Sequence, residues 1–181
     1  MKWIKLVTAF IIVIISVKTL WAQAPSVTDI PPATKTALNQ MMDGYLKIET
    51  ALLKGDPQEA GKAADELNQF ITSVNISGLT PAQLKVYNAQ RGKISHNTEH
   101  IRDNSKNYPH QCEHFDYLTD EFYALLKNLH FNTRPIYYNY TADGNEGNSA
   151  HWLTDKDEMG NPYFKGAIRK TDKRVATLNP Q

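Results

Sequence analysis

Disulfides and the common catalytic motifs are missing from this sequence. It has one cysteine, Cys112, among 181 residues, and a single thiol cannot form a disulfide within the chain, so packing alone must hold the fold. There is no glycine-rich phosphate loop followed by a lysine and no Gly-x-Ser-x-Gly elbow around a nucleophile. There is also no pair of carboxylates set in apolar sequence. These absences predict that the protein is not an enzyme.

Only one long apolar run occurs, and it lies close to the N-terminus. It spans residues 6–17 and follows the basic start MKWIK. The run is short for a membrane span, which needs about 20 apolar residues, but it is typical of a secretory signal peptide. We predict a signal peptide over residues 1–22, cleaved near Ala22 or Ala24, and a periplasmic or secreted protein with no stable membrane span. An uncleaved anchor is the alternative.

Neither sign of charge is in large excess. The chain has 20 basic and 19 acidic residues, and removal of Lys2, Lys5 and Lys18 with the signal peptide leaves 17 basic residues, a net charge near −2. A slightly acidic protein is poorly suited to bind phosphate backbones, so we predict no nucleic-acid partner.

Apolar residues recur at helical spacing in four segments between residues 34 and 131. Typical helix starts precede three of these segments, at Asp56 with Pro57, at Thr80 with Pro81, and at Pro109. Short loops between helices favour antiparallel neighbours. The pattern predicts an all-α protein, with an antiparallel four-helix bundle over residues 34–131 and a leader over residues 23–33.

Strand formers and turn residues follow the helical segments. The stretches PIYYNY, ADGNEGN and SAHWL predict an aromatic β-hairpin within residues 132–166, which must pack on the bundle because a lone hairpin is marginal in water. Its expected structural anchors are Trp152, Asn161, Pro162, Tyr163 and Phe164. A ligand-stacking platform is the alternative role of its aromatic residues. Residues 167–181 have little to bury and are predicted to form a flexible tail.

Histidines gather around the predicted third loop. His96 and His100 are four residues apart, as are His110 and His114, so each pair shares a helix face and both pairs lie at one end of an antiparallel bundle. Imidazole and thiolate at such spacing are ligands for zinc or copper. The candidate ligands are His114, His110, His100 and Cys112. Because these histidines flank the apolar stripes, a solvated polar face is the alternative.

The C-terminal segment resembles the signature of a bacterial family of exported proteins of unknown function, DUF3347. The stretches IYYNY, HWLT and NPYFKG match that signature, and QCEHF at residues 111–115 resembles a segment of the family's fourth helix. The resemblance covers nearly all of the chain after the predicted signal peptide. Members are also fused to copper and silver efflux adaptors of the CusB type, so the resemblance implies a helical domain related to heavy-metal handling.

This chain departs from the family pattern at the soft metal ligands. The family's Cys-Pro-Met falls on Thr141, Ala142 and Asp143, and its later Met and Cys fall near Ile168 and at Thr171. Since thiolates and thioethers select copper(I), the resemblance implies that copper(I) binding has been lost. Asp143, His151 and the helical histidines would favour zinc or copper(II). We predict an exported, non-catalytic binding module of the heavy-metal-handling type; the alternative is a scaffold or interaction protein of the cell envelope that binds no metal.

Overall fold

The structure is a computed structural model that describes residues 29–180. The predicted signal peptide and most of the predicted leader therefore lie outside the described residues. Within residues 29–180, no helix is both long enough and apolar enough to cross a membrane.

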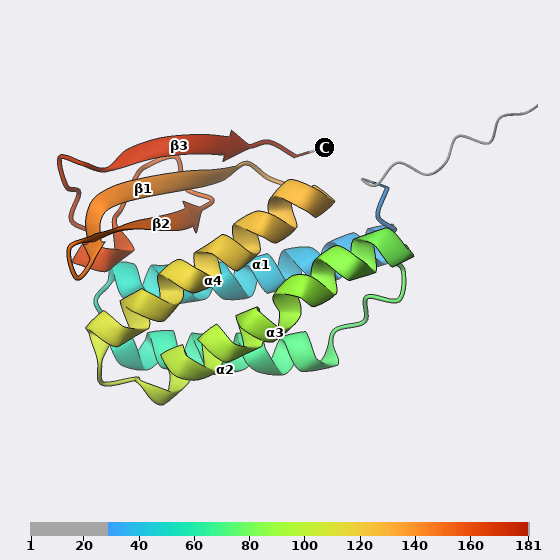
Figure 1. Ribbon diagram of the computed structural model, residues 1–181, viewed down its shortest axis with the longest axis horizontal. Helices are drawn as coiled ribbons and strands as arrows, with labels where there is room; N and C mark the ends of the chain where they lie inside the picture. Colours follow the sequence, from blue (N-terminus) through green and yellow to red (C-terminus); the bar gives the residue numbers. More distant parts are fainter. Residues whose placement is uncertain (1–28, 181) are drawn as a thin grey trace, which may run out of the picture.

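Four helices make up the first part of the described chain: α1 (Pro32–Leu53), α2 (Pro57–Ser73), α3 (Pro81–Asp103) and α4 (Tyr108–Leu129). Consecutive helices run antiparallel and pack along one another (Figure 1). The predicted helix starts are confirmed. The Asp56 carboxylate accepts hydrogen bonds from the N–H groups of Gln58 and Glu59, and Thr80 forms a reciprocal capping box with Gln83. These caps satisfy N–H groups that have no partner within the helix.

A small antiparallel sheet follows the helices. Its strands are β1 (Ile136–Asn145), β2 (Asn148–Thr154) and β3 (Lys173–Leu178), in the order β2-β1-β3. Strands β1 and β2 form the predicted hairpin. Its turn carries Glu146 and Gly147 at φ of 48° and 85°, the left-handed region that tight hairpin turns require.

Two sequence predictions are corrected by β3. The all-α class is an overstatement, because the protein combines four helices with a three-stranded sheet. The predicted tail, residues 167–181, contains the third strand, which pairs with Ile136–Tyr140 of β1. No side chain of β3 is fully buried, so the strand has little hydrophobic signal in the sequence. Its backbone pairs with a strand edge that would otherwise be unpaired.

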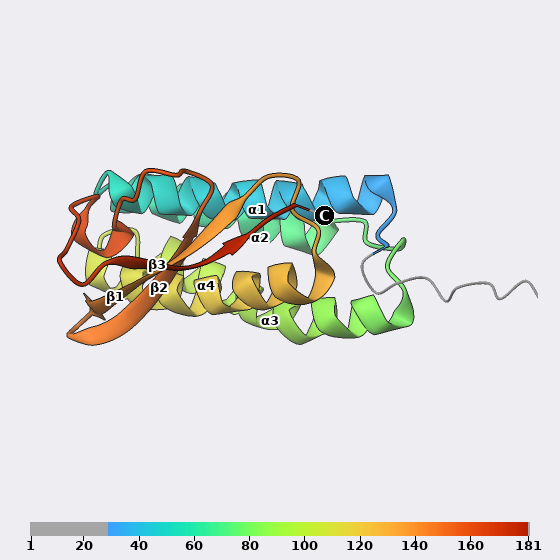
Figure 2. The same ribbon diagram turned by 90° about the horizontal axis from the view of Figure 1, so that it is seen from above.

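The sheet lies over the seam between α1 and α4 (Figure 2). A chain of hydrogen bonds crosses this seam. The Leu153 N–H of β2 donates to the Tyr45 hydroxyl at 3.1 Å. Tyr45 in turn donates to Thr119 Oγ1 at 2.6 Å, since the Thr119 hydroxyl donates to the Phe115 carbonyl at 2.9 Å. Strand β2, helix α1 and helix α4 are thereby fixed relative to one another.

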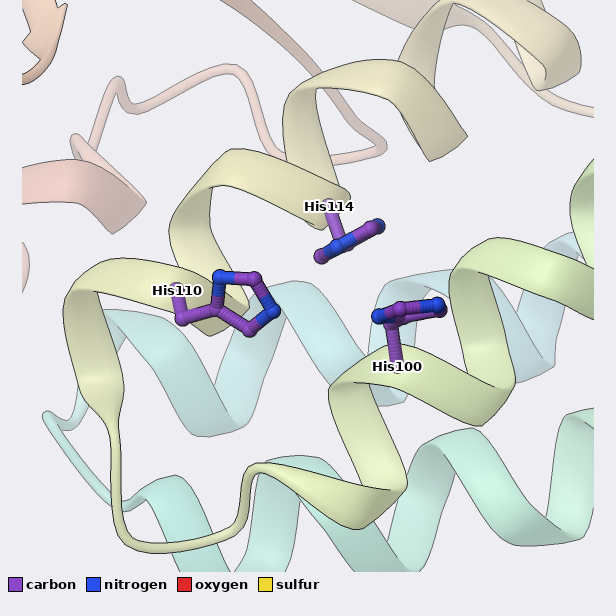
Figure 3. A group of neighbouring side chains, drawn as sticks. All are labelled: His100, His110 and His114. Carbon is purple, nitrogen blue, oxygen red and sulfur yellow. The ribbon is translucent and has the colours of Figure 1, made fainter.

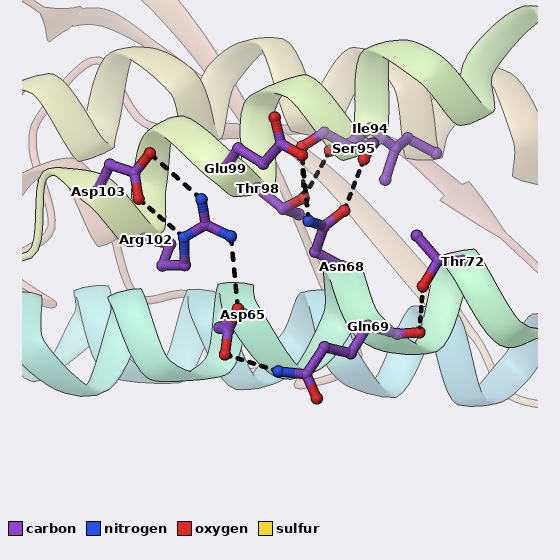
Figure 4. Close-up of polar contacts among 10 residues, drawn as sticks. All are labelled: Asp65, Asn68, Gln69, Thr72, Ile94, Ser95, Thr98, Glu99, Arg102 and Asp103. Carbon is purple, nitrogen blue, oxygen red and sulfur yellow. Dashed lines mark hydrogen bonds and ion pairs between the residues drawn. The ribbon is translucent and has the colours of Figure 1, made fainter.

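Helices α2 and α3 are joined by a polar seam (Figure 4). Asn68 accepts a hydrogen bond from Ser95 Oγ at 2.6 Å, and its amide nitrogen donates to Glu99 at 3.4 Å. One turn further on, Arg102 lies 3.5 Å from Asp65. Because Ser95, Glu99 and Arg102 face α2, the neighbouring positions 96, 97 and 100 of α3 face α4.

The predicted anchors of the hairpin are mostly buried. Trp152 and Asn161 are fully buried, Pro162 and Tyr163 are buried, and Phe164 is partly buried against the core. Asn161 caps the short 3-10 helix η1 (Pro162–Phe164) by accepting a hydrogen bond from the Tyr163 N–H at 2.9 Å. The Tyr163 hydroxyl donates to the His151 carbonyl of β2. These side chains therefore connect the segment after the hairpin to the helices and to β2.

A buried carboxyl joins α1 to the end of β2. Glu49 is 1% exposed. Burial raises its pKa to about 7, although a hydrogen bond with Thr154 and the charge of Lys156 act in the opposite direction. Near neutral pH, ionisation of Glu49 is therefore disfavoured by the folded state.

Replacement of Trp152 by alanine should destabilise the fold by about 3 to 5 kcal/mol, because it removes a fully buried indole and leaves a cavity. Urea denaturation followed by circular dichroism measures this change. Val175→Ala serves as the control, since Val175 is 51% exposed and its truncation should change the free energy of unfolding by less than about 0.5 kcal/mol. Equal stability of Trp152→Ala and the unmodified protein would show that the sheet is not anchored through this residue.

Glu49→Gln should stabilise the protein at pH 8 by up to about 3 kcal/mol and have little effect at pH 4. The pKa of Glu49 is higher in the folded state than its ordinary value of 4.5. The stability that depends on the protonated carboxyl is therefore complete below pH 4.5 and is lost as the pH rises through 7. Denaturation of both proteins across this range gives the difference. A stabilisation that does not depend on pH would contradict the account.

Candidate metal centre

Three histidines converge where α3 ends and α4 begins. His100, His110 and His114 each offer one ring nitrogen, and within residues 29–180 these nitrogens all lie within 4.8 Å of one another. Figure 3 shows the three rings turned toward a common space, with His100 on α3 and the other two on α4. The predicted clustering of the helical histidines is thus present in the structure.

The imidazole rings form a continuous row. The ring centres of His100 and His114 are 4.1 Å apart and nearly parallel, and the ring of His110 is 4.7 Å from that of His114. His96 lies at the other end of the row, with its ring centre 4.4 Å from that of His100. Four imidazoles from two helices therefore lie side by side at one end of the helical layer.

His114 is the best buried of the four, at 8% exposure. Its pKa is lowered to about 4, first because burial disfavours the charged ring, and then because His100 and His110 would repel a second positive charge. At neutral pH the His114 ring is consequently uncharged. A neutral imidazole is the form that binds a metal ion.

Two of the rings have a side-chain oxygen within hydrogen-bond distance of Nδ1, which orients the ring. His114 Nδ1 lies 3.0 Å from Asn97 Oδ1, and His110 Nδ1 lies 3.2 Å from Glu113 Oε2. A neutral ring whose proton is on Nδ1 donates to such an oxygen and keeps the lone pair of Nε2 for another ligand. This arrangement is the usual support of a metal-binding histidine.

The separation of the ring nitrogens is close to what a metal ion needs. Nitrogen ligands bind zinc at about 2.0 to 2.1 Å, so two ligands of a tetrahedral ion are about 3.3 Å apart. The observed nitrogens lie within 4.8 Å of one another. Since His100 and His110 are only partly buried, small rotations of their side chains can close this difference.

Cys112 is not brought together with the histidines. It is 4% exposed and belongs to the hydrophobic core, because position 112 is two residues from both 110 and 114 and so faces the other side of α4. Burial raises the pKa of its thiol to about 12. The prediction of Cys112 as a ligand is therefore not supported by its position, and its thiol stays protonated at neutral pH.

The positions that the resemblance assigns to soft ligands lie close together in the C-terminal part. Thr141 Oγ1 lies 3.4 Å from Thr171 Oγ1 and 3.2 Å from Asp143 Oδ1. Asp143 also lies 3.7 Å from Arg169, so its charge is already compensated. These residues form an internal polar contact between β1 and the loop before β3.

His151 is likewise separate from the histidine row. The His151 ring stacks on that of Tyr138 at 4.9 Å, and the backbone N–H of His151 donates to Asp116 Oδ1 at 2.8 Å. Burial lowers the pKa of His151 and raises that of Asp116 to about 6. These contacts join β2 to α4 and explain His151 as a packing residue.

A surface groove opens beside the histidine row. It encloses about 410 Å³ and is lined by Gly92, Lys93, His96, Asn97, His114, Tyr117 and Glu121. Tyr117 is 47% exposed and is among the exposed large apolar side chains. The buried His114 is therefore reached from solvent along the side of the row on which His96 lies.

Sequence reasoning did not single out Asn97 or Glu113 as site residues. Asn97 lies between Ile94 and Ile101 on the buried face of α3, at 4% exposure. A polar residue at such a position needs a buried partner, and this requirement was the available signal. Glu113 follows His110 by three residues, which is the spacing of helical neighbours.

Comparison with known proteins gives one match. The family described as "Protein of unknown function (DUF3347)" matches residues 41–134, from α1 to the loop before β1. No curated protein and no solved structure matches the chain. The matched region covers more than half of the 181 residues and includes His100, His110 and His114. The chain belongs to the DUF3347 family.

Proposed function

We propose that this protein is a non-catalytic binding module that holds a divalent metal ion through His100, His110 and His114. The observation that carries the proposal is the convergence of these three ring nitrogens within 4.8 Å. Support comes also from Asn97 and Glu113, whose side-chain oxygens lie within hydrogen-bond distance of Nδ1 of His114 and His110, respectively. A solvated polar face has no need of either feature.

The ligand set favours zinc or copper(II). Imidazole nitrogens are intermediate in softness and suit both ions, whereas copper(I) is selected by thiolates and thioethers. Cys112 lies in the core with its thiol protonated. The four methionines of the chain are Met1, Met41, Met42 and Met159, and none is close in sequence to the histidines. We therefore propose a preference for zinc or copper(II) over copper(I).

Sequestration or presentation of the ion is the role we propose, in an exported protein. The predicted signal peptide supports export, and the family resemblance supports a link with heavy-metal handling. The one cysteine of the chain, Cys112, is buried, and its raised pKa keeps it a thiol rather than a nucleophilic thiolate. The chemistry available to the site is thus binding rather than covalent catalysis.

The purified protein should bind one zinc ion with micromolar or tighter affinity. Calorimetric titration with zinc, copper(II) and copper(I) measures this affinity, and copper(I) should bind the most weakly. The double variant His110→Ala/His114→Ala should lose zinc binding by at least about 100-fold, because only one of the three converging imidazoles is left.

The matched control is His151→Ala, which removes an imidazole outside the histidine row. Its zinc affinity should equal that of the unmodified protein. An unmodified protein that binds none of the three ions would overturn the proposal and leave a scaffold or interaction role as the remaining explanation. Zinc binding that survives in the double variant would show that the ion is held elsewhere.

Glu113→Ala should weaken zinc binding about 10-fold, within the 10- to 100-fold range seen when an outer hydrogen-bond partner of a ligand is removed. The carboxylate orients His110 through Nδ1, and without it the ring is free to rotate. Glu158→Ala is the control, since it removes an exposed carboxylate from the loop after β2. If both variants bind zinc equally well, Glu113 has no part in orienting the ligand.

A further inference from the structure

A fourth imidazole, that of His96, lies in the same row as the three converging rings. Around a tetrahedral ion bonded at about 2.0 to 2.1 Å, the centres of neighbouring imidazole rings are about 5 Å apart. In the row, the centres of His96 and His100, His100 and His114, and His110 and His114 are 4.4, 4.1 and 4.7 Å apart. His96 to His114 and His100 to His110 are both 6.0 Å. Five of the six ring pairs thus have centre-to-centre distances between 4.1 and 6.0 Å, on either side of the required value; the sixth pair is His96 and His110.

We propose that His96 is the fourth protein ligand and closes a tetrahedral site with His100, His110 and His114. This inference rests on the proposed metal-binding function and specifies its coordination. His96 shares a face of α3 with His100, four residues away, so its ring already lies next to that of a proposed ligand. The movement needed is a rotation of the His96 side chain toward His110, since these two rings are not in contact in the structure.

The surroundings of His96 permit this rotation. Its side chain is exposed, and no hydrogen bond or ion pair holds its ring nitrogens among the described residues. Gly92, one turn earlier on the same face, has open space where a side chain would begin. The His96 ring is therefore held in its present position neither by a polar partner nor by packing on the Gly92 side.

Other candidates for the fourth position are already engaged or face away. Glu113 is occupied with His110 Nδ1, and Cys112 faces the core. Glu121 lines the groove but pairs with Lys93 at 3.4 Å. Among the described side chains around the site, His96 is the nearest one that could supply a further nitrogen ligand and whose ring nitrogens have no hydrogen-bond partner. The remaining alternative for the fourth coordination position is a water molecule, which would leave the ion with one exchangeable position.

Cobalt(II) and azide distinguish a closed site from an open one. Tetrahedral cobalt(II) reports its ligands through its visible absorption, and azide binds only where a coordination position is open. We expect the spectrum of the cobalt-loaded protein to be unchanged by excess azide. The His96→Ala variant should bind cobalt at least about 10-fold more weakly, and its spectrum should respond to azide.

His151→Ala is again the matched control and should behave as the unmodified protein does. His96→Gln gives a second variant with a bulkier side chain in the groove, and circular dichroism verifies folding of all three. An azide response of the unmodified protein that equals that of His96→Ala would overturn the four-ligand site and leave the three-histidine function standing. If the unmodified protein binds no cobalt, zinc or copper(II), both proposals fall.

Discussion

The hydroxyl of Tyr45 is the contact on which the arrangement of helices and sheet depends. It accepts the N–H of Leu153 and donates to Thr119, whose own hydroxyl donates to the Phe115 carbonyl. Its ring also stacks on Phe115 at 5.1 Å. The hydroxyl of this fully buried tyrosine finds its partners inside the protein, and these partners link α1, α4 and β2. The same contact occupies an N–H on the outer edge of β2, and Asp116 occupies another, so this edge of the sheet is closed by the helices.

The histidine site follows from how α3 and α4 are held. Helix α4 is fixed through Thr119 and Phe115, and α3 is fixed through the polar seam with α2, which turns positions 96, 97 and 100 toward α4. The short connection between α3 and α4 then places two histidine pairs side by side. Asn97 sits on the buried face of α3 and holds His114 across the helix interface. The site is therefore built on rigid elements, while the side chains of His96, His100 and His110, which are not fully buried, can rotate.

Much of the helical part could be predicted from the sequence, because the signals are local. Asp56 with Pro57 and Thr80 with Pro81 are cap pairs that act within one turn, and the i, i+4 spacing of the histidines depends only on the helix period. Strand β3 could not be predicted, since none of its side chains is fully buried and its partner lies more than 30 residues earlier in the chain. Cys112 was misplaced because proximity in sequence was taken for proximity in space, although two residues along a helix turn a side chain to the opposite face. The orienting role of Asn97 depends on a contact between helices, which the spacing of one sequence does not show.

X-ray absorption at the zinc edge of the zinc-loaded protein tests the central claim most directly. Nitrogen and sulfur ligands differ in bond length, at about 2.0 to 2.1 Å and 2.3 Å, and imidazole rings add a characteristic outer scattering pattern. The account predicts nitrogen neighbours only, with imidazole scattering beyond them, and no sulfur. A sulfur neighbour would place the ion at Cys112. A spectrum with oxygen neighbours alone and no imidazole pattern would contradict the histidine site.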